Sequence, residues 1–63
     1  MPIINIKLAS PLPDKKTKDK VAKEIMDVMV RNLGKNPERI VVFFEDLPKD
    51  SFYFGAKDLE SKD

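Results

Sequence analysis

The amino terminus carries the residue of this chain best suited to chemistry. The sequence begins with Met1-Pro2 and continues into a mostly apolar stretch, residues 3–6. Proline is among the small second residues that generally permit removal of the initiating methionine, which would leave Pro2 with a free secondary amine. An α-amino group titrates near about 8, far below a lysine ammonium, so it can act as a base at neutral pH. The alternative is that Pro2 only precedes an edge strand, where its missing N–H does no harm.

Other catalytic groups are scarce. The sequence contains no His and no Cys, and its hydroxyl residues form no nucleophile motif. Glu45 and Asp46 are adjacent, so on a strand their side chains point to opposite faces and do not form an acid–base dyad. Without His or Cys a zinc site is not expected, and we expect no metal and no organic cofactor.

The length and composition indicate a single domain, residues 1–63, that needs support from outside itself. A chain of 63 residues buries only about 60% of the surface that its unfolded form exposes, which leaves it marginal unless it is cross-linked, metal-bound or oligomeric. Disulfides are excluded because there is no Cys. We therefore expect a homo-oligomer.

The charge pattern argues against nucleic acid and membranes as partners. The sequence has 12 Lys and Arg residues against 11 Asp and Glu residues. The net charge is therefore close to zero and gives no electrostatic reason to expect a polyanionic partner. A lysine cluster does occur, at Lys15, Lys16, Lys18, Lys20 and Lys23. Acidic residues dilute it and no aromatic is interleaved for base stacking, so we interpret it as a solvated helix face. No apolar run approaches the roughly 20 residues of a membrane span, and the start is not a signal peptide; we expect a soluble, cytoplasmic protein.

Periodicity and capping residues predict the first elements. Residues 3–8 alternate as a strand, and residues 9–13 form a proline-containing loop. Asp14 is a good N-cap for a helix over about 15–33, and Gly34 supplies the left-handed residue that ends it. The apolar arc of this helix is broad, so the helix has more to cover than a small sheet.

A second strand is predicted over residues 39–45. Residues 40–44 are continuously apolar, which is typical of a strand buried on both faces. Strand, helix and strand make a βαβ unit with parallel strands. One helix covers one face of the sheet, so the other face should meet another subunit. The aromatic segment 52–54 suits a short C-terminal hairpin or edge strand that reaches onto a neighbour.

Taken together, these features resemble the 4-oxalocrotonate tautomerase family. The resemblance covers essentially the whole chain and is most specific in residues 2–6 and 43–52, in that order and at that spacing. It implies an α/β fold with a C-terminal hairpin, assembled as a hexamer (a trimer of dimers). It also implies a small-molecule substrate and an isomerase reaction. In that reaction Pro2 acts first as base and then as acid in enol–keto conversion of 2-hydroxydienoates and related 2-oxo acids.

The match departs from the family at its arginines. Family members that act on dicarboxylates have an arginine in the loop after the first strand, where this chain has Leu12 or Pro13. A second family arginine aligns with Val41. The aromatic that makes the pocket apolar aligns with Phe52 and is present. Arginine binds carboxylates bidentately, so a monocarboxylate or a phenolic enol is a better substrate here than a dicarboxylate.

Arg39 is a candidate substitute for the missing guanidinium. On a strand it would leave the same face as Val41, about 6.6 Å away. Its alternative role is that of a strand-entry residue paired with Glu38. A competing function for the whole chain is a weakly active or non-catalytic oligomer that serves as a structural or small-molecule-binding module. That reading applies if Met1 stays attached, because Pro2 then has no basic nitrogen.

Overall fold

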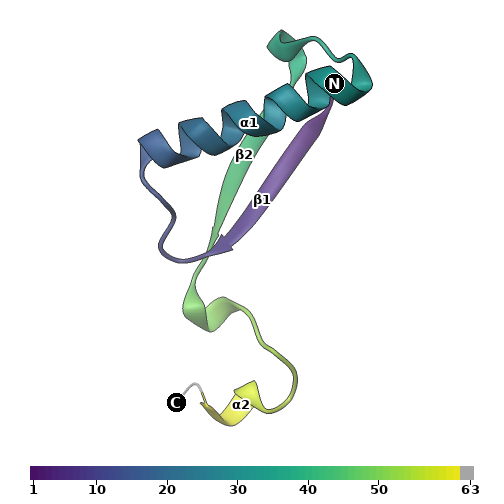
Figure 1. The fold of residues 1–63 in the computed structure, drawn as a ribbon. Helices are drawn as coiled ribbons and strands as arrows, with labels where there is room; N and C mark the ends of the chain where they lie inside the picture. Colours follow the sequence, from purple (N-terminus) through teal and green to yellow (C-terminus); the bar gives the residue numbers. More distant parts are fainter. Residues whose placement is uncertain (62–63) are drawn as a thin grey trace.

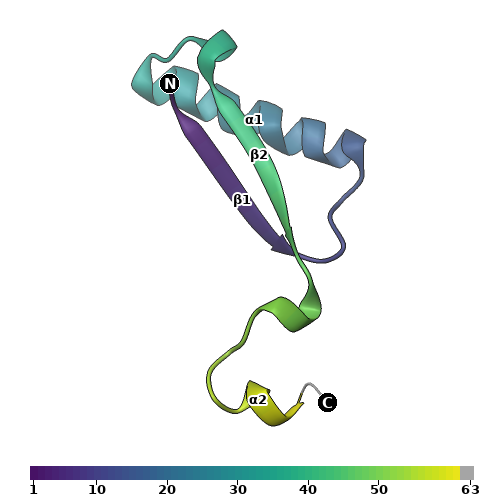
Figure 2. The ribbon, with the colours of Figure 1, turned by 180° about the vertical axis from the view of Figure 1, so that it is seen from behind.

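The computed structural model describes residues 1–61, which form a β-α-β unit followed by a C-terminal arm, residues 48–61 (Figure 1). Strands β1 (Ile3–Ala9) and β2 (Val41–Leu47) form a two-stranded parallel sheet. The helix α1 (Lys15–Leu33) connects them and lies across one face of the sheet, in front of it in Figure 1 and behind it in Figure 2. The predicted βαβ unit with parallel strands is confirmed.

The strands alternate between a half-buried and an exposed face. In β1, Ile4, Ile6 and Leu8 are half-buried and the residues between them are exposed. Val42 and Phe44 continue the half-buried face on β2. This is the face that α1 covers. The opposite face is open in a single chain, with 42% of Phe43 exposed. Burial of β2 on both faces is therefore not achieved within one chain.

Local capping signals fix both ends of α1. The Asp14 carboxylate accepts a hydrogen bond of 2.9 Å from the backbone N–H of Thr17. Hydrogen bonding to the Thr17 side chain and then to its N–H holds the pKa of Asp14 below its ordinary value of 3.8. Gly34 ends the helix at φ 63°, and its N–H donates to the carbonyl of Val30. Helix bounds and caps are as the sequence predicts.

The second strand begins later than predicted. Residues Pro37–Arg39 form a short 3-10 helix, η1, before β2 starts at Val41. The Asn36 side chain caps η1 by accepting from the N–H of Glu38 at 2.9 Å, and the fixed φ of Pro37 favours the helical turn. At its other end β2 continues to Leu47, because residues 45–47 still pair with residues 7–9 of β1. The predicted range of 39–45 was wrong at both ends.

The predicted C-terminal hairpin does not form in the described part of the arm. A second 3-10 helix, η2 (Lys49–Ser51), is followed by a bend and a short helix, α2 (Asp58–Ser61). Phe52 is extended, at φ −141° and ψ 157°, but its segment pairs with no strand among residues 1–61. An isolated two-stranded hairpin is marginal in water, so one chain gives the arm too little to fold against.

The chain is elongated and has almost no interior of its own. Its extents are 47 × 23 × 14 Å and its radius of gyration is 15.7 Å, against about 11 Å for a compact chain of this length. Among residues 1–59, whose exposure the structure describes, Ile40 alone is buried, at 6% exposure. Large apolar side chains that stay exposed lie on both the β-α-β unit and the arm: Ile3, Val28, Leu33, Val41, Phe43, Tyr53, Phe54 and Leu59.

Candidate functional site

Pro2 is held at the beginning of the sheet by a backbone hydrogen bond. Its carbonyl accepts from the N–H of Val41 at 2.9 Å, which anchors the residue to the first residue of β2. Pro2 itself is half-buried, whereas Met1 is 81% exposed. With Met1 in place the Pro2 nitrogen is an amide nitrogen and has no basic lone pair.

The surroundings of Pro2 are apolar. Ile3 and Val41 are directly paired across the sheet and are 62% and 38% exposed. Ile40, the buried residue, precedes Val41. Both side chains are partly open to water in a single chain, so further covering would be needed to take Pro2 out of water.

Arg39 lies at the same end of the sheet as Pro2, but it is not on the strand. It is the last residue of η1, and its backbone N–H donates to the carbonyl of Asn36 at 2.9 Å. The expectation that Arg39 and Val41 share a strand face was therefore wrong, because strand alternation does not extend into a 3-10 helix. The side chain is exposed. It forms no ion pair with Glu38 or with any other residue in the part of the chain described.

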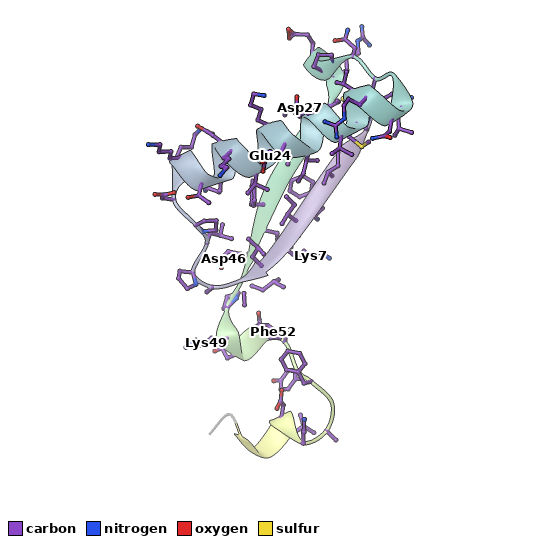
Figure 3. All side chains as sticks on the ribbon, viewed as in Figure 1. Lys7, Glu24, Asp27, Asp46, Lys49 and Phe52 are labelled. Atoms are coloured by element: carbon purple, nitrogen blue, oxygen red, sulfur yellow. The ribbon has the colours of Figure 1, made fainter. Side chains whose placement is uncertain are left out.

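Phe52 is far from Pro2 within one chain. It lies in the arm beyond the C-terminal ends of both strands, whereas Pro2 precedes the first residue of β1 (Figure 3). A strand of 7 residues separates its ends by about 20 Å. Phe52 is half-buried against Phe54, with ring centroids 5.6 Å apart and an interplanar angle of 82°. The two predicted site residues are not brought together by a single subunit.

The positions that align with the family's arginines are also separated. Val41 lies beside the amino terminus through its pairing with Ile3. Leu12 and Pro13 are half-buried in the loop after β1, at the opposite end of the strand. One chain therefore cannot place these two positions around one substrate.

A concave region lies between α1 and β2. It is a shallow depression of about 300 Å³. The residues that line it are two lysines, one aspartate and four apolar residues: Lys15, Lys18, Asp19, Ala22, Val42, Phe43 and Phe44. The lysines of α1 and the phenylalanines of β2 are far apart in the sequence, and only the placement of α1 over β2 brings them together.

The lysine-rich part of α1 is partly neutralised along the helix. Lys15 pairs with Asp19, and Lys23 pairs with Asp27 at 3.1 Å, both at a spacing of four residues. Exposed pairs of this kind contribute little to stability, but they reduce the net charge of the face. The absence of nucleic-acid binding stays a prediction.

Two features of other functional classes are absent from residues 1–61. In that part of the chain no cluster of acidic side chains has the geometry to hold a metal ion. No helix there combines the length and the apolar character that crossing a membrane requires.

The β-α-β fold is that of small tautomerase-type proteins, and comparison with known proteins gives the same class. Residues 2–62 match the model of the family described as "Tautomerase enzyme". The chain belongs to this family. A curated relative, the "Probable tautomerase Cj0270" of Campylobacter jejuni, is 34% identical over 61 residues, covering 97% of this chain and 90% of the relative.

Solved structures agree with this assignment. DmpI from Helicobacter pylori superposes with a TM-score of 0.76 at 30% identity, covering 98% of this chain and 100% of that one. A structure from a study of the 4-oxalocrotonate tautomerase isozymes of Methylibium petroleiphilum superposes with a TM-score of 0.75 over 87% of this chain and 84% of that one. At 22% identity, the second likeness supports the fold alone. Membership of the family indicates an isomerase-type enzyme.

Proposed function

We propose that this protein is a tautomerase of 2-hydroxydienoates or related 2-oxo acids, and that Pro2 is its catalytic base and acid once Met1 has been removed. The observation that carries the proposal is the hydrogen bond from the Val41 N–H to the Pro2 carbonyl. This bond holds Pro2 at the end of the sheet where η1, which carries Arg39, also lies. A cytoplasmic location is part of the same proposal.

The reaction needs only proton transfers. The neutral Pro2 amine takes the proton from the enol hydroxyl, the electron pair moves through the conjugated system, and the resulting ammonium returns a proton to a carbon atom. Substrate and product are isomers, so no oxidant, reductant or cofactor enters. Arg39 is proposed to bind the substrate, and Phe52 is proposed to keep water away from it. A base positioned in this way typically contributes 10²- to 10⁴-fold in rate.

We propose that the complete site forms between subunits of a homo-oligomer, with a hexamer expected. Phe52 cannot reach Pro2 of its own chain, so the aromatic wall must come from another copy. The surface area supports association, because the chain exposes 5206 Å² whereas a compact protein of 7.2 kDa exposes about 4100 Å². The excess is comparable with the roughly 800 Å² that each partner buries in a standard interface.

The test is the Pro2→Ala variant with a 2-hydroxydienoate as substrate, followed by its ultraviolet absorbance. We expect kcat/KM to fall by at least about 10²-fold while sedimentation shows the same oligomer as the wild type. Both proteins are first checked by intact mass for loss of Met1. Unchanged turnover in the variant would exclude Pro2 as the base.

A second function is favoured by one observation. Leu12, Pro13 and Val41 stand where family members that act on dicarboxylates have arginine. This absence favours a weakly active or non-catalytic oligomer with a structural or small-molecule-binding role. Retention of Met1 in cells, seen as an intact mass that includes methionine, would support this second function.

A further inference from the structure

We propose that the depression between α1 and β2 binds a small aromatic carboxylate, with the ammonium group of Lys18 as the cation that holds it. This site is separate from the proposed function, because the residues that line the depression include none of Pro2, Arg39 and Phe52. The inference is drawn from the place of the depression in the fold, from the burial of Lys18 and from the charges around that lysine.

The depression lies along the outer edge of β2. Three consecutive residues of this strand line it, Val42, Phe43 and Phe44, and none of the lining residues comes from β1. Because neighbouring residues of a strand point to opposite faces, a cavity that touches all three reaches the free edge of the strand. The other wall is formed by the first two turns of α1, from Lys15 to Ala22.

The size and the lining of the depression suit a flat apolar group. Ala22, Val42 and Phe44 are half-buried and carry no polar side-chain atom. A volume of about 300 Å³ is at the lower limit for pockets that bind small molecules. Phenylalanine rings form favourable offset or edge contacts with other aromatic rings. These features favour a ligand of one or two aromatic rings over a long acyl chain.

The edge of β2 adds neutral hydrogen-bond donors. The N–H of Val41 is bonded to the Pro2 carbonyl, so Val41 directs its backbone groups toward β1. In a parallel pair the next residues along the strand direct theirs alternately away from the partner and toward it. The sheet formed by residues 1–61 has two strands, so the N–H groups of Val42 and Phe44 meet no further strand at this edge. Each can donate to a carboxylate oxygen.

Lys18 differs from the other lysines in the first half of α1. It is half-buried, whereas Lys15, Lys16, Lys20 and Lys23 are exposed. In the part of the chain that the structure describes, the Lys18 side chain has no hydrogen bond and no ion pair. A cation that is partly withdrawn from water beside apolar side chains is stabilised by an anionic partner.

The acidic groups near Lys18 are already engaged. Asp19 also lines the depression, but it pairs with Lys15. The Asp14 carboxylate accepts from the Thr17 N–H at 2.9 Å. The pKa of Asp14 is lowered mainly by its hydrogen bonds to Thr17 and less by the charge of Lys18. The two lysines and one aspartate of the lining therefore leave one positive charge, which matches a ligand with a single carboxylate.

The experiment uses 2-naphthoate as the probe and 2-naphthalenemethanol as its neutral counterpart. Calorimetry on the full chain measures binding, and shifts of backbone amide NMR signals identify the residues that the probe contacts. Lys18→Met keeps an unbranched side chain without the charge, and Lys18→Arg keeps the charge. Lys20→Met is the matched control, because Lys20 is exposed on the same helix and does not line the depression. Circular dichroism confirms that each variant retains its helix.

We expect 2-naphthoate to shift the amide signals of Lys18, Asp19 and Ala22 in a saturable way and to bind more tightly than the alcohol. Lys18→Met should weaken binding of 2-naphthoate by about 10-fold and leave binding of the alcohol unchanged. Lys18→Arg and Lys20→Met should bind the acid as the wild type does.

Three results would overturn the proposal. The first is equal affinity of the wild type and Lys18→Met for 2-naphthoate. The second is a set of shifted signals confined to Ile3 and its neighbours, which would place the probe at the Pro2 site. The third is an oligomer that binds no 2-naphthoate, which would point to a second copy of the chain as the occupant of the depression. None of these measurements depends on turnover, so this proposal and the proposed function stand or fall separately.

Discussion

The open face of the sheet allows a quantitative prediction about assembly. Phe43 lies on the face opposite α1 and remains 42% exposed in one chain. Full burial of a phenylalanine contributes about 1.5–3 kcal/mol, so covering the remaining surface adds about 1 kcal/mol per subunit. In Phe43→Lys this gain is lost, and an ammonium is placed in the proposed interface between subunits, where a buried unpaired charge costs several kcal/mol more.

We therefore expect Phe43→Lys to dissociate the oligomer. The assay is sedimentation velocity over a range of protein concentrations, with circular dichroism to follow folding. The wild type should sediment as an oligomer, and the variant should sediment as a monomer of 7.2 kDa with reduced helix content, since a single chain buries little besides Ile40. Lys20→Ala, on the exposed surface of α1, is the control and should leave assembly unchanged. A wild type that sediments as a folded monomer, or a variant that stays oligomeric, would refute this reasoning.

Two further predictions concern the ends of α1. Asp14→Ala should lower the melting temperature, whereas Asp14→Asn, which keeps a capping oxygen, should lower it less. The pKa of Asp14 is lowered in the folded state, so its contribution is present above its ordinary value of 3.8 and is lost as the pH falls through the lower folded value. The wild type and Asp14→Ala should thus converge in stability below that pH, and a constant difference in melting temperature would contradict the cap. Gly34→Ala should lower the free energy of unfolding in urea by about 1 kcal/mol, because a φ of 63° is unfavourable for alanine. A larger loss is not expected, because the added Cβ meets no other atom within 4 Å. A stabilised variant would contradict this strain.

The parts of the fold that depend on local chemistry could be predicted from the sequence. Asp14 and Gly34 determine where α1 begins and ends through their own hydrogen bonds and dihedral angles. Alternating apolar residues identify β1. The parallel pairing of β1 and β2 follows from the long helical connection between them. The start of β2 was missed because the Asn36-Pro37 pair makes a longer turn than the apolar run suggests.

The candidate site was less predictable because it depends on relations between distant residues. The placement of Arg39 at the same end of the sheet as Pro2 follows from the register of β1 and β2, which pairs Ile3 with Val41. The separation of Phe52 from Pro2 follows only from the direction of the arm (Figure 1). The hairpin was not found because the aromatic segment has no partner strand within the described chain. The sequence identifies Pro2, Arg39 and Phe52 as candidates, but it does not show whether one subunit brings them together.

The most direct test of the central claim compares the same chain with and without Met1. Both forms are verified by intact mass, and kcat/KM is measured on a monocarboxylate 2-hydroxydienoate. If the Pro2 amine is the base, the form that begins at Pro2 should turn over the substrate, and the form that retains Met1 should be slower by at least about 10²-fold. Equal rates for the two forms would contradict the account, because the Pro2 nitrogen is an amide in one of them and cannot accept the proton.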